Sequence, residues 1–131
     1  MVDLECGRIS LIKNAAGIVT SPLGLVPKHD GGYRRIHDLS FPPGKSINDG
    51  IPKVFGMIEY TTFDNIAARI HLGDLIVKRD IKDAFRIVPI ALHDRKLLGF
   101  EWQGAYYTEN CLPFGLRTAP AIFNLFAEGL H

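Results

Sequence analysis

The sequence predicts an α+β fold, and three observations lead to that prediction. Two pairs of apolar segments flank glycine-containing turns, over residues 23–39 and 97–108, which is the pattern of β-hairpins. Apolar residues recur at helical spacing near residues 61–72 and again from residue 119 onward. Prolines and glycines crowd residues 42–56, so we expect an irregular connection that divides the chain into two parts.

The composition is that of a folded protein of one domain's length, 131 residues. A hydrophobic content of 47% and a formal net charge of +1 exclude a wholly disordered chain and leave no global basic field to attract a polyanion. No apolar run is long enough to span a membrane, and no signal peptide is visible, so no membrane partner is expected. Cys6 and Cys111 fit neither a disulfide framework nor a metal site, which indicates a reducing, intracellular compartment. The oligomeric state stays open.

The first part is predicted to contain a hairpin with a basic tip. An apolar segment ends at Lys28, a His-Asp-Gly-Gly turn follows, and the second strand begins at Tyr33. If Lys28 and Arg34 lie on opposite strands, their charged ends can converge on a phosphate, which Arg binds bidentately and Lys binds as a point charge. A solvated hairpin surface explains the same charges, and both interpretations stay open.

The second part is expected to begin with a helix over residues 61–72. Thr61 or Thr62 can cap it, and Thr61 with Asp64 fits a capping box. Leu72–Gly73 indicates the end of the helix. Its apolar face consists of Phe63, Ile66, Ala67 and Ile70.

Three further elements complete the predicted fold. Leu75–Ile81 is predicted to be an apolar strand buried on both faces. A hairpin follows, with strands over residues 97–102 and 105–108 around a Gln103–Gly104 turn, and a last helix starts near Ala119–Pro120. Little sequence remains to pack against this helix, which indicates a truncated unit. The helix is expected to pack through Ile122, Phe123, Phe126 and Leu130.

Two positions are candidates for chemistry, each with a purely structural alternative. Asp80 ends the predicted strand and Asp83 follows closely; carboxylate oxygens there suit Mg²⁺, but aspartates at strand ends also cap turns. The Leu112–Gly115 turn could aim backbone amides at an anion, or could simply pack. Spacing alone leaves both alternatives open. Scattered cations such as Arg86 are expected to be solvated.

Three segments, in this order, resemble a reverse transcriptase. They are Ser21–Lys28 with Tyr33–Ser40, then Arg79–Phe85, then Leu112–Asn124, in which Leu-Pro-Phe-Gly-Leu is followed by Ala-Pro. The resemblance covers the chain from about residue 18 to the end, and is closer to retrotransposon polymerases of gypsy or DIRS type than to retroviral ones. It implies fingers over residues 1–60 and a partial palm over residues 61–131, the palm being a ferredoxin-like antiparallel sheet with helices on one face.

The resemblance also implies roles for individual residues. Asp80 would be the first catalytic aspartate and, with the backbone carbonyl of Ile81, a ligand of Mg²⁺, of which the complete enzyme holds two ions. Phe85 would stand at the steric gate that favours deoxynucleotides. The implied partners are an RNA or DNA template-primer and deoxynucleoside triphosphates. The other implied nucleotide-binding positions are Lys28, Arg34, Asp83, Ala84, Phe114 and Gly115.

One part of the family's pattern is absent. The second acidic motif, an aromatic residue followed closely by two adjacent aspartates, occurs nowhere in the chain. In the family it lies downstream of the Ala-Pro helix, so we expect a fragment, truncated before that motif, of an RNA-directed DNA polymerase that works by two-metal phosphoryl transfer. We expect no catalysis by the fragment alone, and an exposed sheet edge with an uncovered apolar face. The alternatives are a non-catalytic nucleic-acid-binding remnant, a co-opted retroelement piece, and a small interaction protein that kept the pattern.

Overall fold

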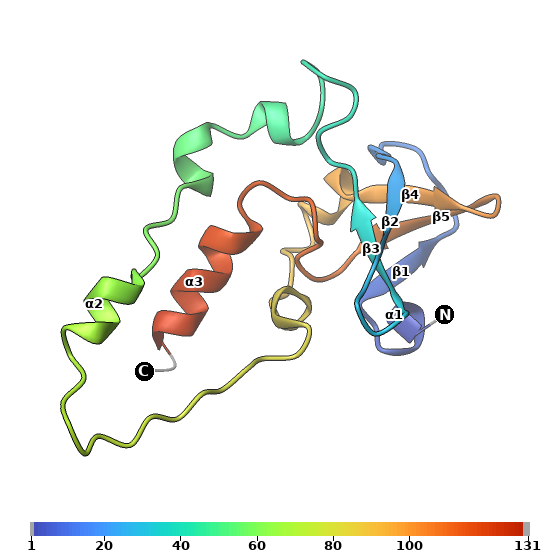
Figure 1. Ribbon diagram of the computed structural model, residues 1–131. Coiled ribbons are helices and arrows are strands. Elements are labelled where there is room, and N and C mark those ends of the chain that lie inside the picture. The colour runs from blue at the N-terminus through green and yellow to red at the C-terminus, as the bar shows by residue number, and fades with distance from the viewer. Residues whose placement is uncertain (1, 130–131) are drawn as a thin grey trace.

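A computed structural model describes residues 2–129 and has the expected α+β fold, with two separate antiparallel sheets (Figure 1). The strands are β1 (Ile9–Ile12), β2 (Leu23–Pro27), β3 (Tyr33–His37), β4 (Gly99–Trp102) and β5 (Ala105–Glu109). The α-helices are α1 (Val2–Glu5), α2 (Phe63–Ala67) and α3 (Ala119–Gly129). Short 3₁₀ helices occur at Asn48–Gly50, Lys53–Gly56, Ala84–Ile87 and Arg95–Leu97.

The larger sheet joins an early strand to a late hairpin. Its strand order is β1-β5-β4, and Ile9 lies opposite Glu109 in the β1–β5 pair. The predicted β4–β5 hairpin is confirmed: Gln103 and Gly104 have φ of 50° and 77°, which are the left-handed conformations that a two-residue hairpin loop requires. Strand β1 was not predicted, because no turn residues join it to a neighbouring strand in the sequence. Its four residues pair with β5, which lies far along the chain.

The smaller sheet is the predicted basic hairpin, β2–β3. Val26 lies opposite Arg34, and the Lys28 amide donates to the Gly32 carbonyl at 2.7 Å to close the turn. Gly31 adopts φ of 83°, a conformation that glycine reaches without steric cost. The hairpin therefore holds its basic residues at the tip and on the near part of β3.

One cluster of the hydrophobic core lies where α3 meets the segments before β4 and after β5. Its buried members are Val88, Leu112 and Ala119. Ile122 and Phe123 pack against them as predicted. Phe126, also predicted to pack, is half exposed, and the expected contact of Leu130 lies outside the described residues. The other buried hydrophobic residues, outside this cluster, are Ile9, Leu39, Leu98 and Phe100.

Residues 60–82 form an arm that loops away from both sheets (Figure 1). The helix predicted over residues 61–72 is confirmed only over Phe63–Ala67, and its capping box joins Thr62 to Asn65 instead of Thr61 to Asp64. The strand predicted over Leu75–Ile81 is wrong. No described strand lies beside that segment to complete a hydrogen-bond ladder, and an unpaired segment gains nothing from strand geometry.

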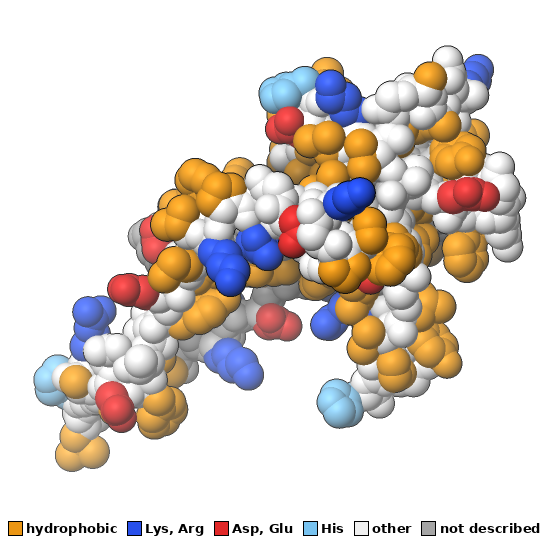
Figure 2. All heavy atoms as spheres, turned by 90° about the horizontal axis from the view of Figure 1, so that it is seen from above, with side chains coloured by type: hydrophobic (Ala, Val, Ile, Leu, Met, Phe, Trp, Pro, Cys, Tyr) orange, Lys and Arg blue, Asp and Glu red, His pale blue; other side chains and the backbone are white. Residues whose placement is uncertain are grey.

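Apolar side chains remain uncovered on the arm and on other surfaces of the molecule (Figure 2). Phe63 and Leu75 are 83% and 97% exposed, and Leu72 is fully exposed. The arm therefore carries uncovered apolar surface, and the expected uncovered face of the sheet stays a prediction. Among the described helices, none has the length and apolar character needed to cross a membrane.

Candidate functional site

One hollow of about 1220 Å³ brings together three segments that are far apart in the sequence. The hairpin contributes Lys28 and Arg34, the end of the arm contributes residues 80–84, and the turn after β5 contributes Phe114. Seven of the predicted site residues therefore line one space: Lys28, Arg34, Asp80, Ile81, Asp83, Ala84 and Phe114. Phe85 and Gly115 do not line it, but both support its wall.

The two predicted phosphate-binding cations lie on one face of the hairpin. Arg34 lies opposite Val26, and Lys28 follows Val26 by two residues, so all three side chains share a face. The Arg34 guanidinium also lies over the Phe114 ring, 5.0 Å from its centroid. This cation–π contact positions Arg34 at the boundary between the hairpin and the turn after β5.

The Phe114–Gly115 turn is fastened to the end of β3. The His37 amide donates to the Phe114 carbonyl at 2.9 Å, and Gly115 has φ of 117°. A side chain at Gly115 would overlap the His37 carbonyl oxygen, so only glycine permits this approach. Phe85 packs behind Phe114, with 5.3 Å between the ring centroids, and this contact fixes the wall of the hollow.

Asn48, which has no obvious signature in the sequence, braces the same turn from the other side. Its buried side chain donates to the Gly115 carbonyl at 2.8 Å and accepts from the Arg117 amide at 2.8 Å. The irregular connection over residues 42–56 therefore has a structural role, because it supplies the residue that holds the turn in place.

The two predicted aspartates have different surroundings. Asp80 is exposed, and its carboxylate forms no ion pair or hydrogen bond with any residue between 2 and 129. Asp83 has φ of 55°, and its carboxylate accepts from Arg8 Nη2 at 3.2 Å. No group of three or more His, Cys, Asp or Glu that could hold a metal occurs in the described part of the chain. A single free carboxylate does not complete a Mg²⁺ site, so these residues by themselves do not fit the ion.

A buried ion-pair cluster lies beneath the hollow. Glu109, 1% exposed, is bound by Arg35 Nη1 and by Arg86 Nη1, each at 2.8 Å. Arg86 is therefore not a solvated charge as expected; it is buried because Glu109 and the carbonyl oxygens of Cys111 and Leu112 accept from it. The sequence does not show that Arg35 and Arg86 pair with Glu109, because the three residues lie on different elements.

The electrostatics of the cluster favour the ionised carboxylate. Burial alone would raise the pKa of Glu109, but the facing imidazole of His37 and the charges of Arg35 and Arg86 outweigh it, so the pKa lies below its usual range. For Arg8, partial desolvation lowers the pKa, while Asp83 and Asp3 raise it above the ordinary arginine value. Glu109 is consequently ionised at neutral pH.

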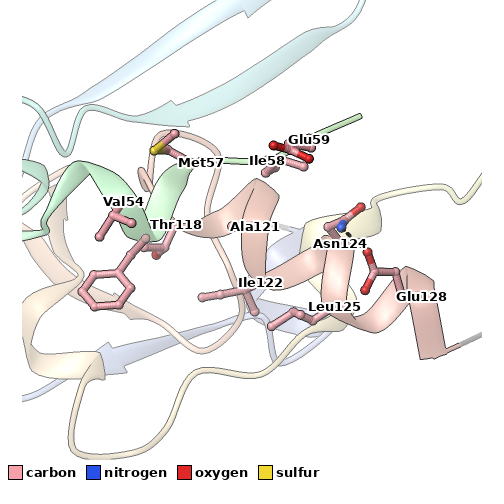
Figure 3. A pocket seen from close by; sticks show the side chains of 11 residues that line it. Val54, Met57, Ile58, Glu59, Thr118, Ala121, Ile122, Asn124, Leu125 and Glu128 are labelled. Carbon is pink, nitrogen blue, oxygen red and sulfur yellow. Dashed lines mark hydrogen bonds between the residues drawn. The ribbon is translucent and has the colours of Figure 1, made fainter. Parts of the chain in front are cut away.

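A second hollow, of about 580 Å³, lies between Val54–Glu59 and α3 (Figure 3). Its walls are largely apolar, and Asn124 donates to Glu128 at its rim (Figure 3). None of its lining residues is basic. Of these two hollows among residues 2–129, the larger one is therefore the one that offers cations to an anionic ligand.

The chain belongs to the reverse transcriptase (RNA-dependent DNA polymerase) family, whose model matches residues 26–131. The Tf2-3 polyprotein of a Schizosaccharomyces pombe transposon is 25% identical over 119 residues, which are 91% of this chain and 8% of the polyprotein. The predicted relationship to gypsy-like retrotransposons is thereby confirmed. A closer relationship to DIRS-like elements stays a prediction.

Solved structures agree with this assignment. A foamy viral protease-reverse transcriptase in complex with double-stranded DNA superposes with a TM-score of 0.70 at 22% identity, over 98% of this chain and 21% of that one. The native prototype foamy virus protease-reverse transcriptase gives 0.68 at 25% identity, over 98% and 16% of the two chains. The chain thus spans 8% of the Tf2-3 polyprotein and 16–25% of the foamy virus chains that it matches.

Proposed function

We propose that this chain forms the nucleotide-binding part of an RNA-directed DNA polymerase, with fingers over residues 1–60 and part of the palm over residues 61–131. The observation that carries the proposal is the meeting of three separate segments at one hollow. Lys28 and Arg34 stand at its basic side, and Asp80 supplies a carboxylate with no protein partner. Phosphates of a deoxynucleoside triphosphate would bind the cations, which neutralise charge on the phosphate oxygens.

Individual residues have distinct roles in this proposal. Asp80 and the Ile81 carbonyl would be two of the ligands of Mg²⁺, and the remaining ligands would have to come from outside residues 2–129. The chemistry that such an ion supplies in phosphoryl transfer is activation of a hydroxyl and stabilisation of the leaving group. The backbone amides of Asp83 and Ala84 would face the triphosphate. Phe85 and Phe114, already packed together, would form the wall against the sugar and base, where Phe85 disfavours a 2′-hydroxyl.

By itself the chain is expected not to extend a primer, because Asp80 is the one unpaired carboxylate among the described residues of the hollow. The test is incubation of the purified chain with Mg²⁺, a template-primer and deoxynucleotides. Templated incorporation above the level of an Asp80→Asn variant would contradict this expectation.

Nucleotide binding tests the proposal directly. Titration of the chain with dTTP, followed by amide chemical shifts, should perturb signals from all three segments, and Arg34→Gln should weaken binding roughly tenfold through loss of a bidentate phosphate contact. Lys13→Gln is the matched control, because it removes one positive charge from an exposed site outside the hollow. Equal affinities of the two variants would contradict the proposed pocket.

A second candidate function is nucleic-acid binding without catalysis. It is favoured by the basic tip of the hairpin, and by a similar structure that is described as a complex with double-stranded DNA. Binding of a template-primer through phosphates should weaken steeply with salt, because contacts release counterions. A salt-independent interaction, or none, would instead favour a small interaction protein that kept the family pattern.

A further inference from the structure

We propose that Arg8, Arg35 and Arg86 form a second binding site, for a phosphate group, and that the carboxylate of Asp3 fills this site in the present structure. The site uses neither Lys28 nor Arg34. It opens on the same hollow as Lys28 and Arg34, but it uses different side chains, so substitutions can test the two sites separately.

Three guanidinium groups from different parts of the chain converge on one carboxylate. Arg35 Nη2, on β3, donates to Asp3 Oδ2 at 2.9 Å. Arg86 Nη2 lies 3.5 Å from the same oxygen, and Arg8 Nη1 lies 3.6 Å from Asp3 Oδ1. Planar guanidinium donors that converge on oxygen atoms are the usual means by which arginine binds phosphate.

One donor in this site has no acceptor. The Arg86 side chain is 6% exposed, and its Nη2 is buried without a hydrogen bond, although Asp3 Oδ2 lies 3.5 Å away. A buried donor without an acceptor is costly. The flat carboxylate of Asp3 serves three guanidinium groups incompletely, whereas a tetrahedral phosphate has a further oxygen that can accept from Arg86 Nη2.

Asp3 lies on a weakly anchored element. Helix α1 has four residues, none of them buried, and its return to β1 relies on backbone hydrogen bonds such as that from the Arg8 amide to the Asp3 carbonyl. In the cluster, three arginines are balanced by Asp3, Asp83 and Glu109. Displacement of Asp3 therefore leaves one uncompensated positive charge and an unsatisfied buried donor.

A ligand can reach the cluster from solvent. Asp3, Arg8, Arg35 and Arg86 all line the larger hollow, which is open enough to admit a phosphate. Asp3 thus acts as an internal competitor for the anion, and withdrawal of α1 would expose the site.

The test compares the wild-type chain with Asp3→Asn in their affinity for inorganic phosphate. Binding is measured at low ionic strength from the NMR signals of the arginine Nε–H groups. Asp3→Asn should bind phosphate roughly tenfold more tightly, because it removes the competing carboxylate and restores one charge-assisted hydrogen bond to the ligand. Asp3→Ala should give the same gain, which excludes an effect of the new amide. Asp64→Asn, an identical charge change at an exposed position on α2, should give none.

Two double variants locate the bound anion. Asp3→Asn with Arg8→Gln should lose most of the gain, and Arg8 is one-quarter exposed, so its replacement leaves the core intact. Asp3→Asn with Lys28→Gln should keep the gain. The proposal is overturned if Asp3→Asn gains no affinity, if Asp64→Asn gains as much, if Arg8→Gln has no effect, or if Lys28→Gln removes the gain.

A second ligand distinguishes the sources of the phosphate. If Asp3→Asn also gains affinity for single-stranded oligothymidylate, the site accepts a nucleic-acid backbone. If the gain is confined to inorganic phosphate, the site takes a free or terminal phosphate. Both results support a phosphate site, and a gain for neither ligand refutes it.

Discussion

Replacement of Glu109 by Gln should destabilise the fold by about 3 kcal/mol. The carboxylate is 1% exposed and binds two guanidinium groups, so the change leaves buried positive charge without its counter-charge. Removal of one partner from a buried ion pair commonly costs about 3–5 kcal/mol, and glutamine keeps the volume and one acceptor, which favours the lower figure. Domains are stable by only about 5–15 kcal/mol, so the loss is a large fraction of the total.

Urea denaturation followed by circular dichroism measures this loss. With a denaturant dependence of about 1–3 kcal/mol per molar urea, the unfolding midpoint should fall by roughly 1–3 M. Glu101→Gln is the control: it makes the same change at an exposed position on β4 and should alter the free energy of unfolding by less than about 0.5 kcal/mol. A loss at Glu109 no larger than that of the control would refute the view that this cluster holds β3 and β5 together.

Three further predictions concern the same framework. The pKa of Glu109 is lower in the folded chain than in the unfolded one. The contribution of Glu109 to stability is therefore complete above the unfolded pKa of about 4.3 and is lost as the pH falls through the folded pKa. As the pH is lowered, the urea midpoint should fall more steeply in the wild type than in Glu109→Gln. Asn48→Ala removes three hydrogen bonds and should cost about 2 kcal/mol in the same assay, whereas Asn124→Ala, at an exposed helical pair, should cost less than about 0.5 kcal/mol. Gly115→Ala should cost about 3 kcal/mol, because a Cβ would overlap a backbone carbonyl at a positive φ, while Gly50→Ala, which faces open space, should be nearly neutral in thermal unfolding.

The elements that sequence patterns predicted well are those stabilised locally. Both hairpins have turns whose glycines specify them, and α3 begins with a proline at its first turn. The strand over Leu75–Ile81 was wrong for the opposite reason. An apolar pattern predicts burial, but strand geometry depends on a neighbouring strand, and the described residues supply none at that place.

In the candidate site too, some residues could be predicted from the sequence and others could not. The resemblance to the family selected nine residues, and seven of them line one hollow, although their roles remain a proposal. It did not indicate Asn48, Glu109 or the burial of Arg86, because these depend on contacts between residues far apart in the chain. Charge patterns in a sequence do not reveal which cation is paired, and pairing decides whether a cation is solvated or buried.

Photo-crosslinking with an azido derivative of dATP tests the central claim most directly. The label should attach to peptides from the β2–β3 hairpin, from residues 80–85 and from residues 112–115, and unlabelled dATP should compete with it. Labelling of Val54–Glu59 and α3 instead, around the apolar hollow of Figure 3, would contradict the assignment of the nucleotide site.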